Sequence, residues 1–362
     1  MENELHIINK HNKPTVNLGM SGGVDSSVAA ILLQKAGYNV KGITFELCGS
    51  HESSKQSLAL ASEVAKDVGI EWKSINLRDE FAVNVMDNFV EAYENACTPN
   101  PCVICNRKIK FKYLIQPSAE DCKEPDYIAT GHYAKIEYCE KTGRWLLKKA
   151  DNQNKDQSYF LYYLTQDVLQ KCIFPLSSYS KDEIRDIASK NGLSIANKKD
   201  SQDVCFVPDG DYAAFISEYA NARKGFAPGN FEDLDGHILG QHKGLIHYTI
   251  GQRKGLGLAL KAPMYVHYLD VERNAVVLGS DLDLFSNKLI VKDFNWVSCE
   301  KPSAPFRAKA RIRYRHKEAD CTVYPDEIVK IIFDAPQRAI TPGQSCVVYQ
   351  DDIVLGGGII VK

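Results

Sequence analysis

The stretch Gly19 to Ser27, which reads Gly-Met-Ser-Gly-Gly-Val-Asp-Ser-Ser, decides the fold of this chain. It follows a short apolar run, Thr15 to Leu18, and precedes the apolar stretch Val28 to Ala36. This order predicts a strand, a glycine loop and the N-terminus of a helix. Adjacent glycines let backbone N–H groups approach a phosphate, and the free N–H groups of a helix end favour an anion. The sequence therefore predicts a phosphate-binding loop, with a ligand-free turn as the alternative.

The residues that the loop lacks narrow its chemistry. There is no Gly-Lys-Ser/Thr, so the loop is not one that holds a γ-phosphate for kinase-type transfer. The pattern resembles the PP-loop of ATP pyrophosphatases, which bind the β,γ-pyrophosphate as a leaving group and adenylate a substrate oxygen. The resemblance implies the same use of ATP here.

The composition is that of a globular protein with two or three domains. The chain has 362 residues, of which 44% are hydrophobic and 25% charged. A net charge of -2 means that any basic surface must be local. Met1 to Lys13 is polar, and no apolar run reaches the roughly eighteen residues of a membrane span. We therefore expect a soluble, cytoplasmic protein.

Strands alternate with helices before residue 209, and short β-patterned segments follow it. This predicts an α/β fold: a parallel-sheet PP-loop ATP-pyrophosphatase domain at 1–209, a small β-rich central domain at 210–284 and a C-terminal β-barrel-like domain at 285–362. Ligands of such a sheet bind at the carboxyl ends of its strands. Besides the first strand and helix, we expect strands at 39–44, 71–76 and 127–130, helices at 54–68, 79–95, 158–171 and 180–191, a hairpin at 135–149, and turns at 341–343 and 356–358.

The cysteines are numerous but scattered. Eleven thiols, an odd count, argue against a secreted disulfide framework. Only the spacing Cys102-Val-Ile-Cys105 and the isolated Cys205 suggest chemistry. Those expected to have no chemical role are Cys48, Cys97, Cys122, Cys139, Cys172, Cys299, Cys321 and Cys346.

The segment around Cys102 and Cys105 contains two prolines, which predict a shaped loop that opens into a helix at about Cys105. That helix carries Arg107, Lys108, Lys110 and Lys112, a charge run that is either a solvated face or the neighbourhood of a thiol. A thiol near a helix N-terminus and beside cations should have a depressed pKa. The polar segment 197–208 contains Cys205, and we expect it to fold over a site as mobile active-site loops do.

A basic strand is predicted near the C-terminus. Arg307, Lys309, Arg311, Arg313 and Arg315 occupy alternate positions, so a strand would place all five cations on one face. Five aligned cations repel one another, which favours phosphate-backbone binding over a merely solvated face.

Together these motifs resemble those of the bacterial tRNA-specific 2-thiouridylases over nearly the whole chain. This family converts the wobble uridine, position 34 of tRNA, to 2-thiouridine. The matching motifs are the loop at 19–27, Ala-Thr-Gly-His-Tyr-Ala at 129–134, Lys-Asp-Gln-Ser-Tyr-Phe-Leu at 155–161, Asp-Val-Cys-Phe at 203–206, Tyr-Thr-Ile-Gly-Gln-Arg-Lys-Gly-Leu-Gly at 248–257, and Thr-Pro-Gly-Gln with Leu-Gly-Gly-Gly near the C-terminus.

The resemblance implies ATP and Mg²⁺ as cofactors, tRNA with a wobble uridine as substrate, and tRNA contacts in the two later domains. ATP would bind through Gly19, Met20, Ser21, Gly22, Gly23, Val24, Asp25, Ser26, Phe45 and Gly131. Asn100, Pro101 and Cys102 would contact the target base. The other implied tRNA contacts are His132, Lys155, Asp156, Gln157, Arg313, Tyr314 and Gln344.

For sulfur transfer, the resemblance implies a persulfide on Cys205 and a partner thiol at Cys105. The sulfur donor would be a persulfide relay protein, a cysteine desulfurase or sulfide. Many family members have aspartate where this chain has Cys102. Cys102, Cys105 and Cys205 could therefore hold a [4Fe-4S] cluster with one open iron for sulfide, and zinc is a third, weaker option.

Two other classes of function remain open at this point. Another PP-loop synthetase or ligase that adenylates a small molecule would explain the loop and the sheet but would leave the basic strand and the thiols unused. A non-catalytic RNA-binding or cluster-carrying protein would use the loop only as scaffold.

Overall fold

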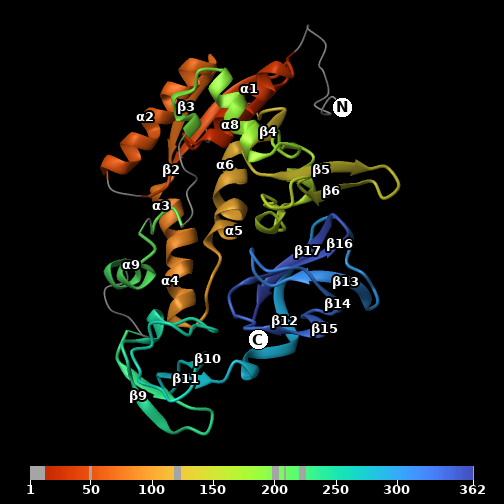
Figure 1. The fold of residues 1–362 in the computed structure, drawn as a ribbon. Coiled ribbons are helices and arrows are strands. Elements are labelled where there is room, and N and C mark those ends of the chain that lie inside the picture. The colour runs from red at the N-terminus through yellow and green to blue at the C-terminus, as the bar shows by residue number, and fades with distance from the viewer. Residues whose placement is uncertain are drawn as a thin grey trace.

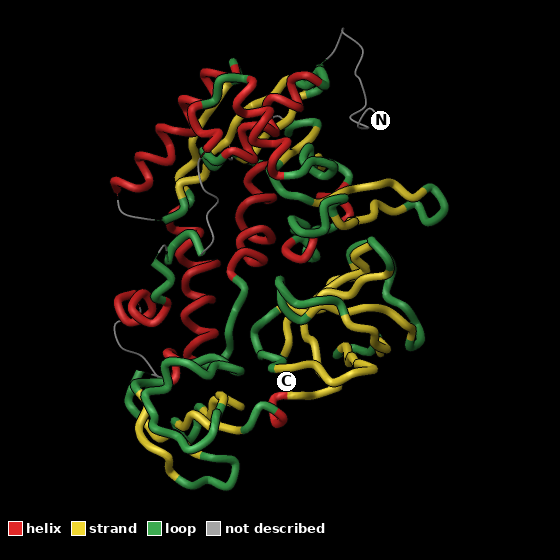
Figure 2. The backbone as a smooth tube through the Cα atoms, in the orientation of Figure 1, coloured by secondary structure: helices red, strands yellow, loops and turns green. Residues whose placement is uncertain are grey.

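The computed structural model of the protein describes residues 13–48, 51–117, 124–197, 204–207, 209–219 and 226–361. An α/β part lies at one end, a small β-rich part lies at the other, and a β-barrel lies beside them (Figure 1). Two helical columns run between the α/β part and the small β-rich part (Figure 2). Among the described residues, no helix has the length and apolar character needed to cross a bilayer.

The N-terminal sheet is parallel throughout, as predicted. Its strand order is β3-β2-β1-β4-β7, so β1 lies at the centre and the carboxyl ends of all strands meet at one edge. The strands are β1 (Thr15–Gly19), β2 (Asn39–Glu46), β3 (Glu71–Asn76), β4 (Tyr127–Ala129) and β7 (Cys172–Ile173).

Apolar cores lie on both faces of this sheet. Helices α1 (Val24–Lys35), α2 (His51–Val68) and α8 (Lys181–Lys190) share one core with Val16 and Leu18 of β1. Ile43 and Ile128 belong to a second core, which includes residues of α6 (Phe111–Ile115). The predicted capping box of α8, formed by Ser180 and Glu183, is confirmed.

Two helical columns contain single π-helical turns. The first consists of α3 (Arg78–Phe81), a π turn and α4 (Asp87–Glu94), which confirms the helix predicted at 79–95. The second consists of α5 (Pro101–Cys105), a π turn at Asn106–Lys110 and α6. The prediction that this helix begins at about Cys105 is wrong. It begins at Pro101, because proline fits the first helical position, where no N–H is needed.

The helix predicted at 158–171 is also wrong. The segment forms a 3-10 turn (Ser158–Phe160), irregular turns and the short helix α7 (Gln166–Leu169). Tyr159 and Tyr162 are fully buried, and both hydroxyls bond to Ser345 of the C-terminal domain. These tertiary contacts override the local helical propensity.

The central part is a small sheet that follows α9 (Tyr212–Tyr219). Its strand order is β10-β11-β8-β9. The strands are β8 (Gly229–Glu232), β9 (Ile238–His242), β10 (Tyr265–Asp270) and β11 (Ala275–Gly279).

The C-terminal part is a closed barrel, because its first strand pairs with its last. Its strands are β12 (Phe285–Trp296), β13 (Phe306–Arg311), β14 (Ala319–Tyr324), β15 (Val329–Arg338), β16 (Ser345–Gln350) and β17 (Ile353–Ile360). The turn predicted at 356–358 is wrong: these glycines lie inside β17. A Cβ on Gly357 would lie 2.8 Å from the Tyr162 ring, so glycine permits the close packing of strand and loop.

The hairpin of β5 (Ala134–Cys139) and β6 (Arg144–Lys149) confirms another prediction and adds a connection. Strand β6 pairs with β17 at Lys148 and Ile353, so a hairpin from the first half of the chain extends the barrel's sheet.

A second connection ties the barrel to the loop that precedes α5. Thr98 N–H donates to the Pro342 carbonyl at 2.9 Å, and the Gln344 side chain donates to the Thr98 carbonyl at 2.8 Å. Between them, Gly343 has φ +89°, and a Cβ there would lie 2.9 Å from Thr98 N and Cys97 Cβ. We call this contact, made by residues 97–98 and 342–344, the loop clamp.

We predict that Gly343→Ala opens the loop clamp. The added methyl collides with Thr98, so the amide of Thr98 should exchange with solvent at least about tenfold faster, equivalent to about 1.4 kcal/mol. Hydrogen-exchange mass spectrometry of the peptide around Thr98 measures this. Gly236→Ala is the matched control, because Gly236 has φ +85° but no heavy atom within 4 Å of its added Cβ. Unchanged exchange in Gly343→Ala would contradict the clamp.

Candidate active site

The loop between β1 and α1 has the backbone of an anion site. Gly22 has φ +67°, and α2 packs so closely that a Cβ there would lie 3.2 Å from the Ser57 carbonyl. The N-cap residue Gly23 offers no side-chain cap, so the N–H groups of the first turn of α1 have no side-chain acceptor from that position. The Ser26 hydroxyl bonds to both Ser21 N–H, at 3.3 Å, and the Gly23 carbonyl, at 3.1 Å, which fixes the loop.

Gly131 brings the end of β4 against this loop. A Cβ on Gly131 would lie 3.0 Å from Ser26 N and 3.1 Å from the Asp25 carbonyl carbon, so any side chain would fill the space at the start of α1. Phe45 lies half-buried near the end of the neighbouring strand β2. The side chains of Met20 and Val24 are buried, so neither side chain is free to contact a ligand. The open glycine cradle fits a nucleotide bound at the strand ends.

Asp25 is held by two residues that the sequence did not single out. Its Oδ1 accepts from Tyr133 Oη at 2.7 Å and from Lys181 Nζ at 2.8 Å. Lys181 is buried at the start of α8, so it places a positive charge beside the phosphate loop. No spacing in the sequence links Lys181 to Asp25, because the two are 156 residues apart.

The three predicted thiols share one neighbourhood. Cys102 and Cys105 lie in the same helical turn of α5, where Cys102 is exposed and Cys105 is buried. Cys205 is exposed, and the adjacent Phe206 anchors it by packing against Phe81 and Phe89 at ring distances of 5.7 and 5.2 Å. Of segment 197–208, the structure describes residues 197 and 204–207, and Cys205 is among them.

Lys110 lies near all three thiols. Burial lowers its pKa, but the neighbouring Cys105, Cys102 and Cys205 raise it, and the net shift is upward. The π turn explains this position, because its i→i+5 hydrogen bonds align residues five apart, as Cys105 and Lys110 are. Thus Lys110 faces the thiols, while the rest of the predicted charge run does not.

Of the three predicted thiols, Cys205 is the one with the depressed pKa, and the sequence-based expectation for the α5 thiols is wrong. A hydrogen bond from Cys48, then the charge of Lys110, lowers the pKa of Cys205 to about 7 despite partial desolvation. Burial raises the pKa of Cys105 to about 12, and desolvation also raises that of Cys102. Helix position and nearby cations do not offset this burial.

Cys48 is the thiol that the sequence analysis dismissed and the structure brings to the site. It follows β2, is half-buried, and its Sγ donates to the Cys205 carbonyl at 3.8 Å. The hydrogen bond with the Cys205 side chain is the largest cause of the raised pKa of Cys48. No motif could have shown this, since 157 residues separate the pair.

The thiols do not form a site for a single metal ion. Among the described residues, the group whose ligand atoms lie within 4.8 Å of one another is Asp233, Asp235 and His237, on an exposed turn of the central part. Zinc is therefore disfavoured at the thiols. Three sulfur donors around one cation remain chemically suited to an iron-sulfur cluster, whose ligands bind separate irons.

Several residues that the resemblance implies as tRNA contacts already have partners inside the protein. Asp156 is buried, and its carboxylate accepts from Ser158 N–H and Oγ, so the structure does not support direct contact of this side chain with a nucleic acid. His132 bonds to Thr130 Oγ1 at 2.7 Å and stacks on Phe111, and burial followed by Lys110 lowers its pKa to about 3. Gln157 supports the backbone of Tyr133, Tyr314 packs on Phe160, and Gln344 belongs to the loop clamp.

The basic strand is shorter than predicted, and several of its cations already have partners within the protein. Strand β13 ends at Arg311, so Arg313 and Arg315 lie beyond it in a turn. Arg307 pairs with Asp334, Arg311 pairs with Glu318 and, at 3.6 Å, Asp156, and Arg313 donates to the Arg338 carbonyl. Fixed partners neutralise much of this row, which weakens it as a phosphate-binding face.

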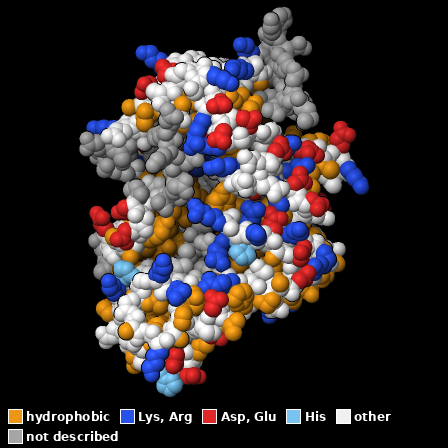
Figure 3. All heavy atoms as spheres, in the orientation of Figure 1, with side chains coloured by type: hydrophobic (Ala, Val, Ile, Leu, Met, Phe, Trp, Pro, Cys, Tyr) orange, Lys and Arg blue, Asp and Glu red, His pale blue; other side chains and the backbone are white. Residues whose placement is uncertain are grey.

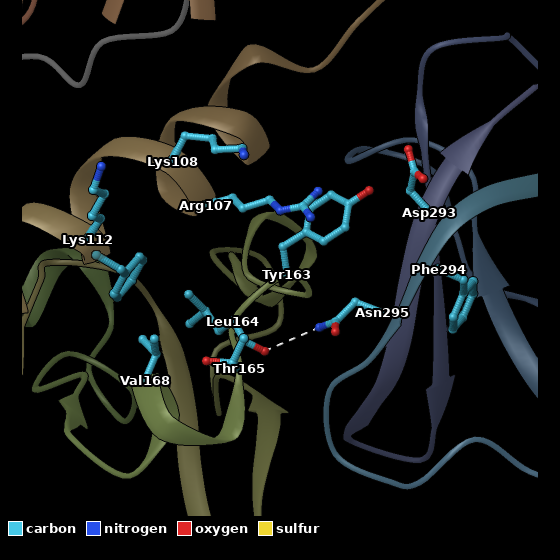
Figure 4. A pocket seen from close by; sticks show the side chains of 11 residues that line it. Arg107, Lys108, Lys112, Tyr163, Leu164, Thr165, Val168, Asp293, Phe294 and Asn295 are labelled. Atoms are coloured by element: carbon cyan, nitrogen blue, oxygen red, sulfur yellow. Dashed lines mark hydrogen bonds between the residues drawn. The ribbon is translucent and has the colours of Figure 1, made fainter. Parts of the chain in front are cut away.

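A basic pocket lies on another side of the thiol-bearing helix column. Its volume is about 510 Å³, and it opens between that column, the loop 163–165 and β12. Arg107 covers the Tyr163 ring at 4.2 Å, and Asn295 donates to the Leu164 carbonyl (Figure 4). Lys108 and Lys112 are exposed at its rim. Lys and Arg side chains also gather around the hollow across the middle of the molecule (Figure 3).

Sequence families match all three parts of the chain. The family described as tRNA methyl transferase HUP domain matches residues 14–209. The tRNA methyl transferase PRC-barrel domain matches residues 213–280, and the aminomethyltransferase beta-barrel domain matches residues 286–360.

Curated relatives match the chain from end to end. The tRNA-specific 2-thiouridylase MnmA of Acetivibrio thermocellus is 46% identical over 360 residues, which is 96% of this chain and 99% of the relative. That of Halothermothrix orenii is 47% identical over 95% of this chain and 98% of its own. The chain belongs to the tRNA-specific 2-thiouridylase family. The parallel sheet, the small central sheet and the closed C-terminal barrel, each matched by a domain family, confirm the predicted α/β fold with a β-rich centre and a terminal barrel.

We predict that Cys205 is more readily alkylated at neutral pH than Cys48, Cys102 or Cys105. Because its pKa is lowered to about 7, its thiolate and therefore its alkylation rate should rise through that pH, well below the 9.0 of an ordinary thiol. Mass spectrometry after iodoacetamide labelling gives the rate for each cysteine.

Lys110→Met should move the midpoint of Cys205 alkylation upward, because the variant removes a stabilising charge. Lys309→Met is the control, since Lys309 lies exposed on the barrel. A wild-type midpoint near 9 would contradict the assignment.

Proposed function

We propose that this protein is an ATP-dependent tRNA sulfurtransferase of the cytoplasm that converts the wobble uridine, position 34, to 2-thiouridine. The observation that carries the proposal is the combination, on one chain, of a PP-loop and an exposed cysteine, Cys205, whose pKa is lowered by the hydrogen bond from Cys48 and then by the charge of Lys110. Relatives named tRNA-specific 2-thiouridylase share 46% identity over almost the full length. A PP-loop ligase for small molecules would leave both the thiols and the barrel without a use.

The first half-reaction is adenylation at the phosphate loop. The N–H groups of Gly22 to Ser26 and the buried Lys181 would receive the triphosphate, and the gap at Gly131 would admit the nucleoside. Mg²⁺ held between Asp25 and the triphosphate would supply charge neutralisation. The uridine C2 oxygen then attacks the α-phosphate, pyrophosphate leaves, and C2 becomes open to substitution of its oxygen.

The second half-reaction is sulfur transfer from Cys205. A persulfide on this exposed thiol attacks C2, the C2–S bond forms, and AMP leaves with the oxygen. Lys110 stabilises the anionic sulfur before attack. Cys105, the predicted partner thiol, would then attack the Cys205 sulfur, so that a Cys105–Cys205 disulfide forms, the bond between Cys205 and the transferred sulfur breaks, and the sulfur stays on C2. Asn100, Pro101 and Cys102, at the start of α5, would position the base. If an iron-sulfur cluster is present instead, Cys102, Cys105 and Cys205 would hold it, and its open iron would bind sulfide.

We assign the tRNA backbone to the basic pocket rather than to the row at 307–315. Lys108 and Lys112 are exposed, and within the described residues neither forms an ion pair. A backbone seated there would bring its neighbouring bases toward α5, because Lys108 follows Cys105 by one helical turn. Lys155, Gln157, Tyr314 and Gln344 would contribute further contacts.

We predict that Cys205→Ser loses 2-thiouridine formation by at least about a thousandfold while still binding tRNA and releasing pyrophosphate from ATP. Adenylation does not use the thiol, so only the second half-reaction should fail. Nucleoside mass spectrometry and a pyrophosphate assay with unmodified tRNA separate the two steps. Cys139→Ser, on the hairpin, is the control. Full thiolation by Cys205→Ser would refute the sulfur-carrier role, and absence of tRNA-dependent pyrophosphate release from wild type would refute the adenylation.

Replacing both Lys108 and Lys112 with glutamine should weaken tRNA binding and lower the slope of log K against log salt by about 1–2. Filter binding at several salt concentrations gives this slope. Arg307→Gln is the matched control, because its guanidinium is already paired with Asp334. An equal loss of slope in Arg307→Gln would return the backbone contact to the barrel face.

A further inference from the structure

The basic pocket between the α5–α6 column, the loop 163–165 and β12 has features that binding of a phosphate backbone does not need. Its volume of about 510 Å³ is that of a small-molecule site. Besides Lys108 and Lys112 it contains an acid, Asp293, whose charge would repel a phosphate. The lining therefore suits a ligand that offers hydrogen-bond donors as well as negative charge.

The hydroxyl of Tyr163 is a buried donor without a partner. The Tyr163 side chain is 7% exposed and lines the pocket, and its hydroxyl forms no hydrogen bond with any residue that the structure describes. The neighbouring hydroxyl, that of Tyr162, bonds to Ser345 instead. Figure 4 shows the Tyr163 hydroxyl directed toward Asp293. Because a buried hydroxyl without a partner is costly, this one points to a ligand that supplies an acceptor.

Asp293 projects from a bulge in β12. Its φ of +51° is a left-handed conformation, and the pairing of β12 with β17 shifts register between Lys292 and Asn295. The Asp293 side chain is exposed at the pocket, and within the described part of the chain it forms no hydrogen bond or ion pair. Bulges and left-handed residues other than glycine gather at ligand sites, where they direct a side chain toward the ligand.

The C-terminal motif Leu-Gly-Gly-Gly makes room for this bulge. A Cβ on Gly356 would lie 2.3 Å from the Asn295 carbonyl oxygen, and a Cβ on Gly358 would lie 2.5 Å from that of Lys292. These two carbonyls flank Asp293, so the glycines let β17 pack closely against the bulge. The middle glycine of the motif does the same for the tyrosine loop on the other side of the pocket. The motif thus shapes both walls of the pocket.

We propose that the basic pocket binds the base of an unpaired guanosine of the substrate tRNA. The inference rests on the proposed function and deepens it, since only a backbone contact was assigned to the pocket there. Arg107 is exposed and lies 4.2 Å from the centre of the Tyr163 ring, so the base would stack on the other side of its guanidinium. N1–H and N2–H of the base would donate to the Asp293 carboxylate, and O6 would accept from the Tyr163 hydroxyl. Lys108 and Lys112 would meet the flanking phosphates.

Guanine is the common base whose pairing edge fits this set of groups. A carboxylate accepts two parallel hydrogen bonds only from two adjacent donors, and guanine presents N1–H beside N2–H. Adenine and cytosine present one amino group beside a ring nitrogen that the carboxylate would repel, and uracil presents one donor between two oxygens. A free guanine nucleotide has the same edge, but the cations at the rim of an open pocket favour a base that belongs to a chain of phosphates.

Kethoxal footprinting of unmodified tRNA tests the proposal, because kethoxal reacts at N1 and N2 of unpaired guanines. Each full-length protein is used at about ten times its own Kd for the tRNA, so a base held at this edge should react about tenfold more slowly. We expect wild type to protect one such guanosine and Asp293→Asn to leave it unprotected. Asparagine tolerates the left-handed backbone. Asp351→Asn is the matched control, because Asp351 is exposed with φ +53° on another barrel turn.

Absence of any protected guanosine, or equal protection by wild type and Asp293→Asn, would overturn the proposal. A transcript with inosine at the protected position lacks only the N2 amino group. Inosine should weaken binding to wild type about fivefold and binding to Asp293→Asn less than about twofold, because the partner of that amino group is already changed. Equal losses in the two proteins would also contradict the contact with Asp293.

Tyr163→Phe tests the second contact. The variant should weaken tRNA binding at least about threefold without lowering the midpoint of thermal unfolding, because the hydroxyl has no partner in the free protein. Filter binding and thermal denaturation measure the two effects. A lower unfolding midpoint with unchanged tRNA binding would mean that the hydroxyl is structural and would overturn its assignment to the base.

The wild-type protein separates failure of this inference from failure of the function on which it rests. If wild type forms 2-thiouridine but protects no guanosine, only the inference fails. If wild type neither binds nor thiolates tRNA, the proposed function fails and the inference fails with it. Guanosine monophosphate, titrated by calorimetry, tests the free nucleotide. Saturable binding that Asp293→Asn abolishes, together with no protected guanosine in tRNA, would assign the pocket to a free nucleotide and overturn tRNA as the source.

Discussion

A half-buried lysine among thiols is the constraint on which the candidate site depends. A cation taken out of water needs negative partners nearby, and the groups that Lys110 meets are Cys102, Cys105 and Cys205. Only Cys205 combines exposure with a hydrogen-bond donor, so the negative charge settles there. Burial, and then the charge of the same cation, lower the pKa of His132 and keep it neutral. The π turn in the α5–α6 column creates this arrangement by placing Lys110 on the thiol side.

Residues of the barrel, which lies outside the parallel sheet, fix the position of the helix that carries two of the thiols. The loop clamp fixes the entry to α5, and Asn295 of β12 donates to the carbonyls of Tyr162 and Leu164 on the opposite side of the basic pocket. Inside, Arg311 and Lys149 share Glu318, which joins the barrel to the β5–β6 hairpin through a largely buried ion-pair network. The helix that carries two thiols is therefore positioned by residues that lie more than two hundred positions later in the sequence.

Patterns of local origin predicted most of the fold. The glycine loop, the alternating strands, the capping box at Ser180 and the hairpin all depend on residues close in sequence. Apart from the start of α5, which proline at the first helical position decides locally, the errors occurred where distant parts of the chain decide the outcome. The tyrosines after Ser158 bond to Ser345 instead of forming a helix, and the row from Arg307 to Arg315 turns at Ile312. Within the site, the motifs identified Cys205, but Cys48, Lys110 and Lys181 become meaningful only through burial and long-range contact, which spacing cannot show.

The pairing of β6 with β17 also orders events during synthesis. The hairpin leaves the ribosome about two hundred residues before the strand that covers its edge, because Lys148 of β6 pairs with Ile353 of β17. Domains generally fold from the N-terminus as they emerge, and an unpaired strand edge invites association with other chains. The nascent protein therefore carries an open strand edge until its last strand is made.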